Sequence, residues 1–223
     1  DARPGNAEYL ADHIEAAELR LLDGNHHTPI HGTPQFENWM EAIEGFLTGN
    51  PVGEISVDRV LATVMFADIV DSTAAASRLG AAAWRRTLGR CETLAAELAV
   101  RFGGRVVKSS GEGTLAVFDG PARAVRYAVA LSHATHQQLG VELRAGAHVG
   151  EVEQRGHDIG GISVHIAARV QSKADPSQVL VSSVVEQLCL GSGLLFEPAG
   201  NHTLKGVPGT WELRRVTNEP ANR

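Results

Sequence analysis

The chain has 223 residues and a formal net charge of -6, with 43% hydrophobic and 21% charged residues, which suits one globular domain with an appendage and excludes a disordered chain. This acidic balance excludes nucleic acid and anionic membranes as partners, because both attract clustered Lys and Arg. No apolar run approaches the ~20 residues of a membrane span, and Cys91 and Cys189 lack metal-ligand spacing, so we expect a cytoplasmic protein with two reduced thiols.

The first fifty residues differ in pattern from the rest. Residues 7–22 predict a short helix followed by a strand, and a polar His-rich turn comes next. Residues 35–48 place their large apolar side chains at helical spacing. Gly and Pro residues then stop this helix, so we expect an N-terminal segment over 1–48 and a linker over 49–58.

The remaining chain alternates between strand-like and helix-like segments, which predicts one domain over 59–217 and a tail over 218–223. The order favours an α/β (α+β) sandwich with a central, mostly antiparallel sheet. The expected elements are a buried strand over 60–67, a helix over 81–101, a β-hairpin over 105–118, a helix over 121–139, a strand over 141–152, a glycine turn, a helix over 162–173, and a strand–helix–strand–strand set over 179–216.

The first motif that carries chemistry is FADIVDST, residues 66–73. Its buried strand ends at Asp68, and Asp71, Ser72 and Thr73 follow. A carboxylate at a strand end beside small hydroxyl residues can hold a hard cation, while the backbone N–H groups meet phosphate. The alternative is a helix N-cap at Asp71 or Ser72, which needs no ligand.

The second motif is VVKSSGEGTLAVF, residues 106–118, with Lys108 on a strand and Glu112 between two glycines at a hairpin tip. A carboxylate in this turn, facing another on a neighbouring strand, can supply a second metal ligand. The alternative is a solvated turn glutamate beside an exposed lysine.

The third motif is GHDIGGISVHIAARV, residues 156–170. His165 and Arg169 stand four residues apart and therefore share one face of the expected helix. Such a pair can stabilise negative charge that develops on a phosphate. Taken alone, the pair is better explained as two exposed side chains that happen to point the same way.

Together, in this order and spacing, the three motifs resemble the class III adenylyl and guanylyl cyclase family. The ending LKGVPGTWELRRV, residues 204–216, is similar to the end of many bacterial members, and the resemblance covers residues 60 to 216. It implies a ferredoxin-like α/β palm, and a homodimer with active sites that each use residues of both protomers.

The resemblance also implies roles for individual residues. Asp68, the backbone carbonyl of Ile69 and Glu112 correspond to the ligands of two divalent metal ions, Mg²⁺ or Mn²⁺. The backbone amides near Ser72 and Thr73 correspond to those that approach the terminal phosphates of ATP.

The other protomer would supply the remaining residues. Lys108 and Asp158 match the pair that reads adenine, since adenine offers an acceptor to Lys and an amino donor to Asp, whereas guanine presents the opposite pattern. Arg169 matches the arginine of the transition state, His165 stands at the usual Asn position, and Lys205 falls where a phosphate-binding lysine is expected.

The reaction implied is attack of the ribose 3′ oxygen of ATP on the α-phosphorus, giving cyclic AMP and pyrophosphate. Two departures from the family pattern predict slow catalysis: Glu112 replaces Asp, and His165 replaces Asn. The alternative is a cyclase-like module that binds nucleotide and dimerises with little or no activity. A diguanylate cyclase is disfavoured because the hairpin reads SSGEG, residues 109–113, and not GGDEF.

The N-terminal segment has a separate resemblance. Residues 19–48 are similar to the last strand, catalytic-His loop and final helix of α/β-hydrolases that are fused to such cyclases, with His27 at the position of the hydrolase His. The chain contains no GxSxG nucleophile motif. Hydrolase activity is therefore not expected, and the segment is expected to be a remnant or the end of an upstream domain.

Overall fold

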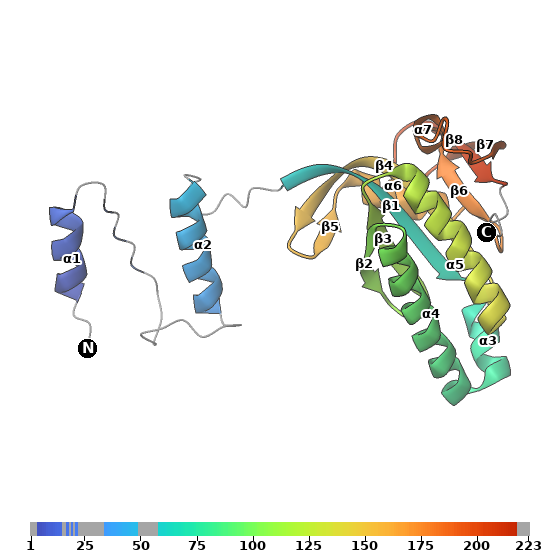
Figure 1. Cartoon of the computed structure of the whole chain (residues 1–223), viewed down its shortest axis with the longest axis horizontal. Coiled ribbons are helices and arrows are strands. Elements are labelled where there is room, and N and C mark those ends of the chain that lie inside the picture. Colours follow the sequence, from blue (N-terminus) through green and yellow to red (C-terminus); the bar gives the residue numbers. More distant parts are fainter. Residues whose placement is uncertain are drawn as a thin grey trace. The chain divides into compact units, whose positions relative to one another are not determined.

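The computed structural model describes residues 4–14, 17, 19, 21, 34–48 and 58–217 (Figure 1). The chain divides into two compact units, Asp1–Ser56 and Val57–Arg223.

The first unit contributes two helices, α1 (Pro4–His13) and α2 (Pro34–Thr48). The second of these confirms the helix expected over 35–48, and its leading proline suits a helix start because that position needs no N–H donor. Of the strand expected before residue 22, only positions 17, 19 and 21 are described, and none is in a strand. The expected His-rich turn and His27 lie outside the described residues.

The second unit alternates strands and helices from Asp58 onward. Its strands are β1 (Asp58–Ile69), β2 (Gly104–Ser109), β3 (Gly113–Phe118), β4 (Leu143–Arg155), β5 (Asp158–Gly160), β6 (Val179–Ser182), β7 (Phe196–Thr203) and β8 (Thr210–Val216). Its helices are α3 (Ser72–Leu79), α4 (Ala81–Arg101), α5 (Pro121–Leu139), α6 (Ile162–Gln171) and α7 (Ser183–Leu188).

All eight strands form one sheet in the order β2-β3-β1-β4-β6-β8-β7, and β5 pairs with β4 outside this path. Every neighbouring pair is antiparallel except β4 and β6. The predicted α/β fold with a mostly antiparallel central sheet is thus confirmed, and β1 lies between β3 and β4.

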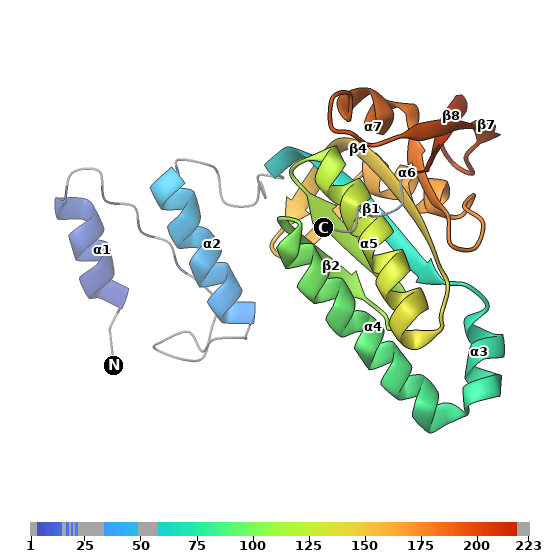
Figure 2. The same ribbon diagram turned by 45° about the vertical axis from the view of Figure 1, so that its right-hand side comes forward.

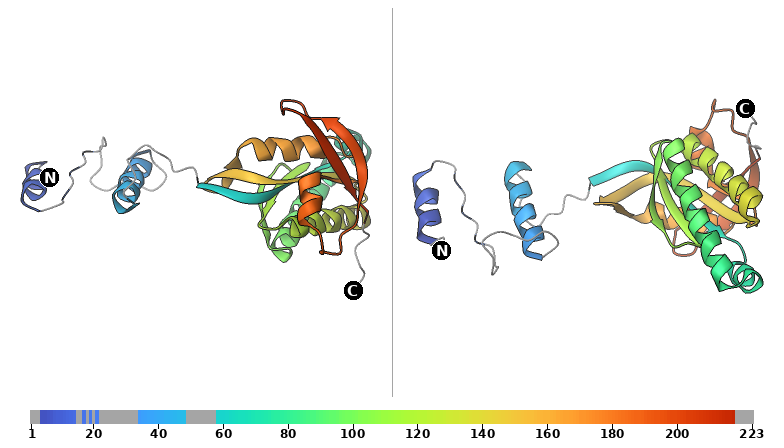
Figure 3. Two further views of the ribbon diagram at one scale, coloured as in Figure 1. Left: turned by 90° about the horizontal axis from the view of Figure 1, so that it is seen from above. Right: turned by 60° about the horizontal axis from the view of Figure 1, so that its bottom comes forward.

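The sheet is covered on both faces. Figure 2 shows α4 and α5 alongside each other, and Figure 3 shows α6 on the face of the sheet opposite to them. Alternation along β1 explains the two cores, since side chains of a strand point to opposite faces in turn. Met65 and Ala67 pack in the core with α4 and α5, whereas Val64 packs in another with Ala167 of α6.

The expected elements of this unit agree with the structure at most boundaries. The helices over 81–101 and 121–139 are confirmed, while the first strand extends beyond 60–67 and begins at Asp58. The glycine turn expected after β4 contains the short strand β5, which the sequence analysis missed. Residues 49–57 of the expected linker and the tail over 218–223 lie outside the described residues.

Two further expectations concern cysteines and membranes. Cys91 and Cys189 are both free, which agrees with the prediction of reduced thiols, and both are also buried. Among the helices that the structure describes, none has the length and apolar character needed to span a bilayer.

A buried histidine gives the sheet a pH-sensitive position. His148 on β4 is 6% exposed, its Nδ1 lies 2.8 Å from the Ser182 hydroxyl on β6, and its ring meets Trp211 edge-on. Burial lowers the pKa of the His148 imidazole to about 4. The folded protein therefore holds this ring neutral at pH values where an unfolded chain, with a histidine pKa near ~6.5, binds a proton.

We expect the free energy of unfolding to fall as pH drops from about 6.5 towards 4. In this range His148 binds a proton in the unfolded state but stays neutral in the folded state. At pH 5 the loss relative to pH 7 should be about 2 kcal/mol from this residue. Urea denaturation at both pH values measures it, and in a folded His148→Gln variant the pH-dependent loss should shrink by this amount. An unchanged pH dependence in that variant would show that other groups cause the loss.

Candidate active site

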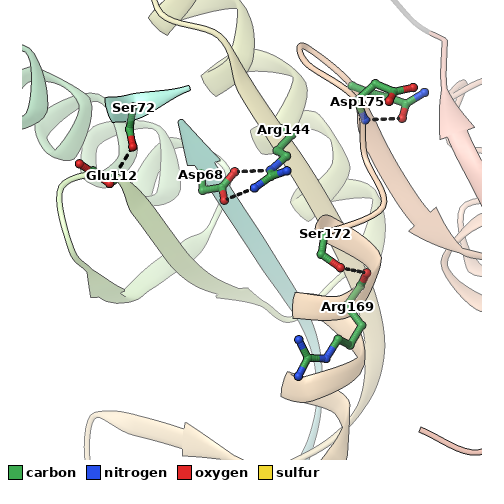
Figure 4. A network of polar contacts seen from close by, with 8 residues as sticks. Asp68, Ser72, Glu112, Arg144, Arg169, Ser172 and Asp175 are labelled. Atoms are coloured by element: carbon green, nitrogen blue, oxygen red, sulfur yellow. Dashed lines mark hydrogen bonds and ion pairs between the residues drawn. The ribbon is translucent and has the colours of Figure 1, made fainter. Parts of the chain in front are cut away.

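Asp68 stands near the end of β1 between two neighbouring strands. In the sheet register it lies opposite Gly113 of β3 and opposite Arg144 of β4. The guanidinium of Arg144 donates to both carboxylate oxygens, with Nε–Oδ1 at 2.8 Å and Nη2–Oδ2 at 3.0 Å (Figure 4). The strand pairing therefore fixes this carboxylate near the end of an interior strand of the sheet and gives it a cationic neighbour.

Glu112 lies at the tip of the β2–β3 hairpin, directly after Gly111, which adopts a φ of +77° that L side chains rarely reach. Its carbonyl accepts a hydrogen bond from the backbone N–H of Ile69 at 2.8 Å, which ties the tip to the end of β1. Its carboxylate accepts a hydrogen bond from the Ser72 hydroxyl at 2.9 Å. The hairpin thus presents Glu112 beside the strand end that carries Asp68.

The N-terminus of α3 completes this side of the site. Asp71 precedes the helix in the left-handed conformation (φ 51°) and makes no side-chain capping bond. The first N–H groups of a helix have no partner within it, and the helix dipole adds partial positive charge there. Ser72 and Thr73 begin the helix, so their amides suit a phosphate group.

These residues surround one open cleft of about 680 Å³. The cleft brings together five of the residues singled out from the sequence and adds Asp71, Ala74, Ser77, Ser110, Gly113 and Arg144; the five are Asp68, Ile69, Ser72, Thr73 and Glu112.

The oxygen donors of the cleft fit Mg²⁺ or Mn²⁺ bound together with a polyphosphate. In the described part of the chain no three His, Cys, Asp or Glu side chains group as a metal site. Mg²⁺, however, is usually held by one or two carboxylates together with substrate phosphates and water, not by an all-protein cage. Asp68, Glu112 and the main-chain carbonyl of Ile69 provide this kind of incomplete shell.

Arg144 is the charged residue of the cleft that the sequence analysis missed. The hydrogen-bonded Asp68 carboxylate raises the pKa of the Arg144 guanidinium, with Asp71 adding a further electrostatic contribution, so Arg144 stays charged. A signal was present in the sequence, since Arg144 is a charged residue between the apolar Leu143 and Ala145 in a strand-like run. An arginine there pairs well with carboxylate or phosphate, because its planar fork donates two parallel hydrogen bonds.

Lys108 and Asp158 form a separate pair on the same sheet. Lys108 Nζ donates to Asp158 Oδ2 at 2.5 Å between β2 and β5, and the side chains are about two-thirds and about half exposed, respectively. A nearby hydrogen bond from Arg105 of β2 to the His157 carbonyl, at 2.9 Å, joins β2 to the turn that precedes β5. The structure thus brings together the two residues predicted to read a base, away from the lining of the cleft.

His165, Arg169 and Lys205 lie on the side of the sheet covered by α6. His165 and Arg169 are exposed on that helix, and Arg169 Nε donates to the Lys205 carbonyl at 3.2 Å. None of the three lines the cleft. In Figure 4 the Arg169 guanidinium lies apart from the carboxylates of Asp68 and Glu112.

Within one chain the predicted site residues therefore fall into separate groups. The cleft offers carboxylates, helix amides and one arginine, which suit metal-bound phosphates. The donor–acceptor pair that suits a base edge and the exposed arginine that suits a transferring phosphate lie elsewhere.

The chain matches one protein family and is similar in sequence to known bacterial proteins, two of which follow. The model of the family described as "Adenylate and Guanylate cyclase catalytic domain" matches residues 56–216. Putative adenylate cyclase 3 of Rhizobium meliloti (strain 1021) is 27% identical over 180 residues, which are 75% of this chain and 31% of that protein. The adenylate cyclase of Streptomyces coelicolor is 35% identical over 131 residues, which are 58% of this chain and 34% of that protein. The chain thus spans about a third of the length of these relatives.

A solved structure shares the fold. The adenylyl cyclase CyaB from P. aeruginosa superposes with a TM-score of 0.67 at 21% identity, over 74% of this chain and 97% of that chain.

Proposed function

Because the chain belongs to the adenylate and guanylate cyclase catalytic-domain family, we propose that it converts ATP to 3′,5′-cyclic AMP and pyrophosphate with two divalent metal ions. The observation that carries this proposal is the shared cleft, in which two carboxylates and a helix N-terminus face one space. A cytoplasmic location stays a prediction.

The carboxylates of Asp68 and Glu112 and the carbonyl of Ile69 would hold Mg²⁺ or Mn²⁺ between protein and phosphate. When bound, the two ions lower the pKa of the attacking 3′ hydroxyl and neutralise charge on the leaving pyrophosphate. Glu112 differs from an aspartate by one methylene, and its carboxylate is engaged by Ser72. We therefore propose that metal geometry adjusts at this position and that turnover is slow.

The α3 N-terminus would bind the β- and γ-phosphates. The amides of Ser72 and Thr73 have no helical partner, and they line the same cleft as Arg144. The arginine adds a permanent charge that can donate two hydrogen bonds to phosphate oxygens. These groups orient the triphosphate so that pyrophosphate can leave.

A second protomer would supply the base and transition-state contacts, so we propose a homodimer with shared sites. The separation of Lys108, Asp158 and Arg169 from the cleft supports this arrangement. Lys108 would donate to adenine N1 and Asp158 would accept from the N6 amino group.

Three other residues of that protomer would act on ribose and phosphate. Arg169 would stabilise charge on the α-phosphate, with Lys205 beside it on the phosphates. His165, which replaces an amide, would donate one hydrogen bond near the ribose.

The experiment that tests the proposed function is an assay of the purified chain with ATP and with GTP, in Mn²⁺ and separately in Mg²⁺. Mass spectrometry identifies the cyclic product. Cyclic AMP from ATP supports the proposal. Formation of cyclic GMP alone would show that the enzyme prefers GTP and not ATP. A dimer that binds ATP without forming cyclic product would favour the alternative, a cyclase-like module that binds nucleotide with little catalysis.

Base preference gives a sharper prediction. In a Lys108→Gln variant the ratio of kcat/KM for ATP to that for GTP should fall by about tenfold to a hundredfold, because the donor-only ammonium that suits adenine N1 is replaced by an amide whose oxygen can also accept from the N1–H of guanine. Competition between the two nucleotides in one reaction measures the ratio directly. The matched control is Lys173→Gln, the same change at an exposed residue outside the proposed site, and an equal fall in both variants would argue against a base-reading role.

A further inference from the structure

We propose that Arg144 exchanges between Asp68 and the triphosphate, so that it suppresses metal binding in the nucleotide-free chain and couples metal affinity to nucleotide affinity. This inference rests on the proposed function for the identity of the cleft's ligands. It adds a property of the chain's own residues, namely that the carboxylate that would bind metal is paired with a cation of the protein.

The contact between Arg144 and Asp68 uses both carboxylate oxygens. The two hydrogen bonds, at 2.8 and 3.0 Å, form a parallel fork, and each side chain is only about one-third exposed. A carboxylate in this state has its best lone pairs engaged by N–H donors. A divalent cation therefore has to displace the guanidinium before it can bind Asp68.

The sheet itself imposes this contact. Asp68 and Arg144 are directly opposite in the antiparallel register of β1 and β4, and Ile69 and Leu143 continue the same pairing. Cross-strand neighbours of this kind have their Cβ atoms about 5 Å apart, within easy reach of one another. The arginine therefore returns to Asp68 whenever no stronger acceptor lies in the cleft.

The second carboxylate is engaged more weakly. Glu112 accepts one hydrogen bond from the neutral hydroxyl of Ser72 at 2.9 Å, and a hydroxyl can turn its lone pairs to a cation while staying in place. Asp71 is the other acidic residue lining the cleft, and it adds to the electrostatic attraction on Arg144. Arg144 is thus the main competitor of the metal, and Asp68 is where the two compete.

A triphosphate offers Arg144 an alternative partner in the same cleft. Phosphate oxygens accept the guanidinium fork as carboxylates do, and the α3 amides would hold the phosphates within the space that Arg144 lines. Transfer of Arg144 to phosphate frees both oxygens of Asp68. Nucleotide should therefore tighten metal binding, and metal should tighten nucleotide binding by the same factor.

The exchange predicts opposite effects of one substitution on the two ligands. In an Arg144→Gln variant, nucleotide-free protein should bind Mn²⁺ about tenfold more tightly than wild type. The same variant, in EDTA, should bind 3′-deoxy-ATP, which lacks the attacking hydroxyl, about tenfold more weakly. Electron paramagnetic resonance of free Mn²⁺ measures the first affinity, and isothermal titration calorimetry measures the second; neither requires turnover.

Two control variants are needed to interpret these affinities. Arg123→Gln removes an equal charge from an exposed ion pair with Asp119, at 3.0 Å, and should change neither affinity by more than about twofold. Asp68→Asn should abolish the tight Mn²⁺ site. Circular dichroism establishes that each variant is folded.

Three outcomes would overturn the exchange. If Asp68→Asn weakens Mn²⁺ binding while Arg144→Gln leaves it at the wild-type level, the metal site stands and the exchange is wrong. If Arg144→Gln lowers the affinity for both Mn²⁺ and the nucleotide, the arginine only positions Asp68. If Mn²⁺ binding is independent of Asp68 in every variant, both the exchange and the metal site of the proposed function fail.

Discussion

An Asp68→Asn variant should form cyclic AMP at least about a thousandfold more slowly than the wild-type chain, because several kcal/mol of transition-state charge stabilisation depend on the metal it would hold. The amide keeps the size of the side chain but loses the negative charge. Asp68 is about one-third exposed and its ion pair joins two strands that are otherwise fully paired. The fold should therefore survive, and initial rates in Mn²⁺ measure the loss.

An Arg169→Gln variant should lose activity by a comparable factor for a different reason. Arg169 contacts the Lys205 carbonyl at the surface of α6 and does not line the cleft that contains Asp68. In the proposed homodimer the two residues act in one site but come from different protomers. In a homodimer of either variant, both sites therefore lack one of the two residues and are inactive.

A mixture of the two inactive variants distinguishes a site that is shared between protomers from a site that lies within one chain. In a mixed dimer, one of the two sites receives an intact Asp68 from one protomer and an intact Arg169 from the other. Equal amounts of the variants, exchanged to equilibrium, should recover up to about a quarter of the wild-type rate. A mixture that stays as inactive as its components, although mixed dimers form, would contradict the shared site.

The helices and most strands could be predicted because local patterns determine them. The helix over 121–139 begins at a proline and ends before Gly140, whose left-handed φ of 64° caps it. The helix over 81–101 shows an amphipathic stripe that is buried on one side. The strand β5 escaped prediction because three residues between glycine-rich turns carry too little alternation, and pairing with β4 stabilises it.

The candidate site could be predicted only in part, for a similar reason. Asp68 and Glu112 each lie in a local motif, and the cleft brings them together. Arg144 lies 76 residues from Asp68, and its contact depends on the register of β1 against β4. The sequence shows a charge in an apolar strand, but a register shift of one residue would turn that side chain to the other face.

A close approach between α6 and the sheet depends on one glycine. Gly146 on β4 faces the C-terminal end of α6, and a Cβ built at that position would lie 2.1 Å from the Gln171 nitrogen and 2.4 Å from its Cα. These are backbone atoms, so no side-chain rotation relieves the overlap. The absence of a side chain at Gly146 thus lets α6, which carries His165 and Arg169, rest against the sheet.

A Gly146→Ala variant should therefore lose about 3 kcal/mol or more of the free energy of unfolding, since α6 has to move outward and its buried residues lose contacts. For a unit of this size, such a loss lowers Tm by about 10 °C. Gly89→Ala is the matched control, because that exposed position within α4 has no heavy atom within 4 Å of the added carbon. It should stabilise the protein by about 0.5–1 kcal/mol, as alanine restricts the unfolded chain.

Urea and thermal denaturation of the two variants, monitored by circular dichroism, measure these opposite shifts. The change at Gly146 should also reduce activity beyond its effect on stability, since Arg169 moves with α6 and displacement of a catalytic group by about 1 Å costs about a hundredfold in rate. Mn²⁺ affinity at Asp68 should fall less than activity, because that carboxylate lies on β1. A Gly146→Ala protein with wild-type stability and rate would mean that α6 does not need this contact to hold its arginine in place.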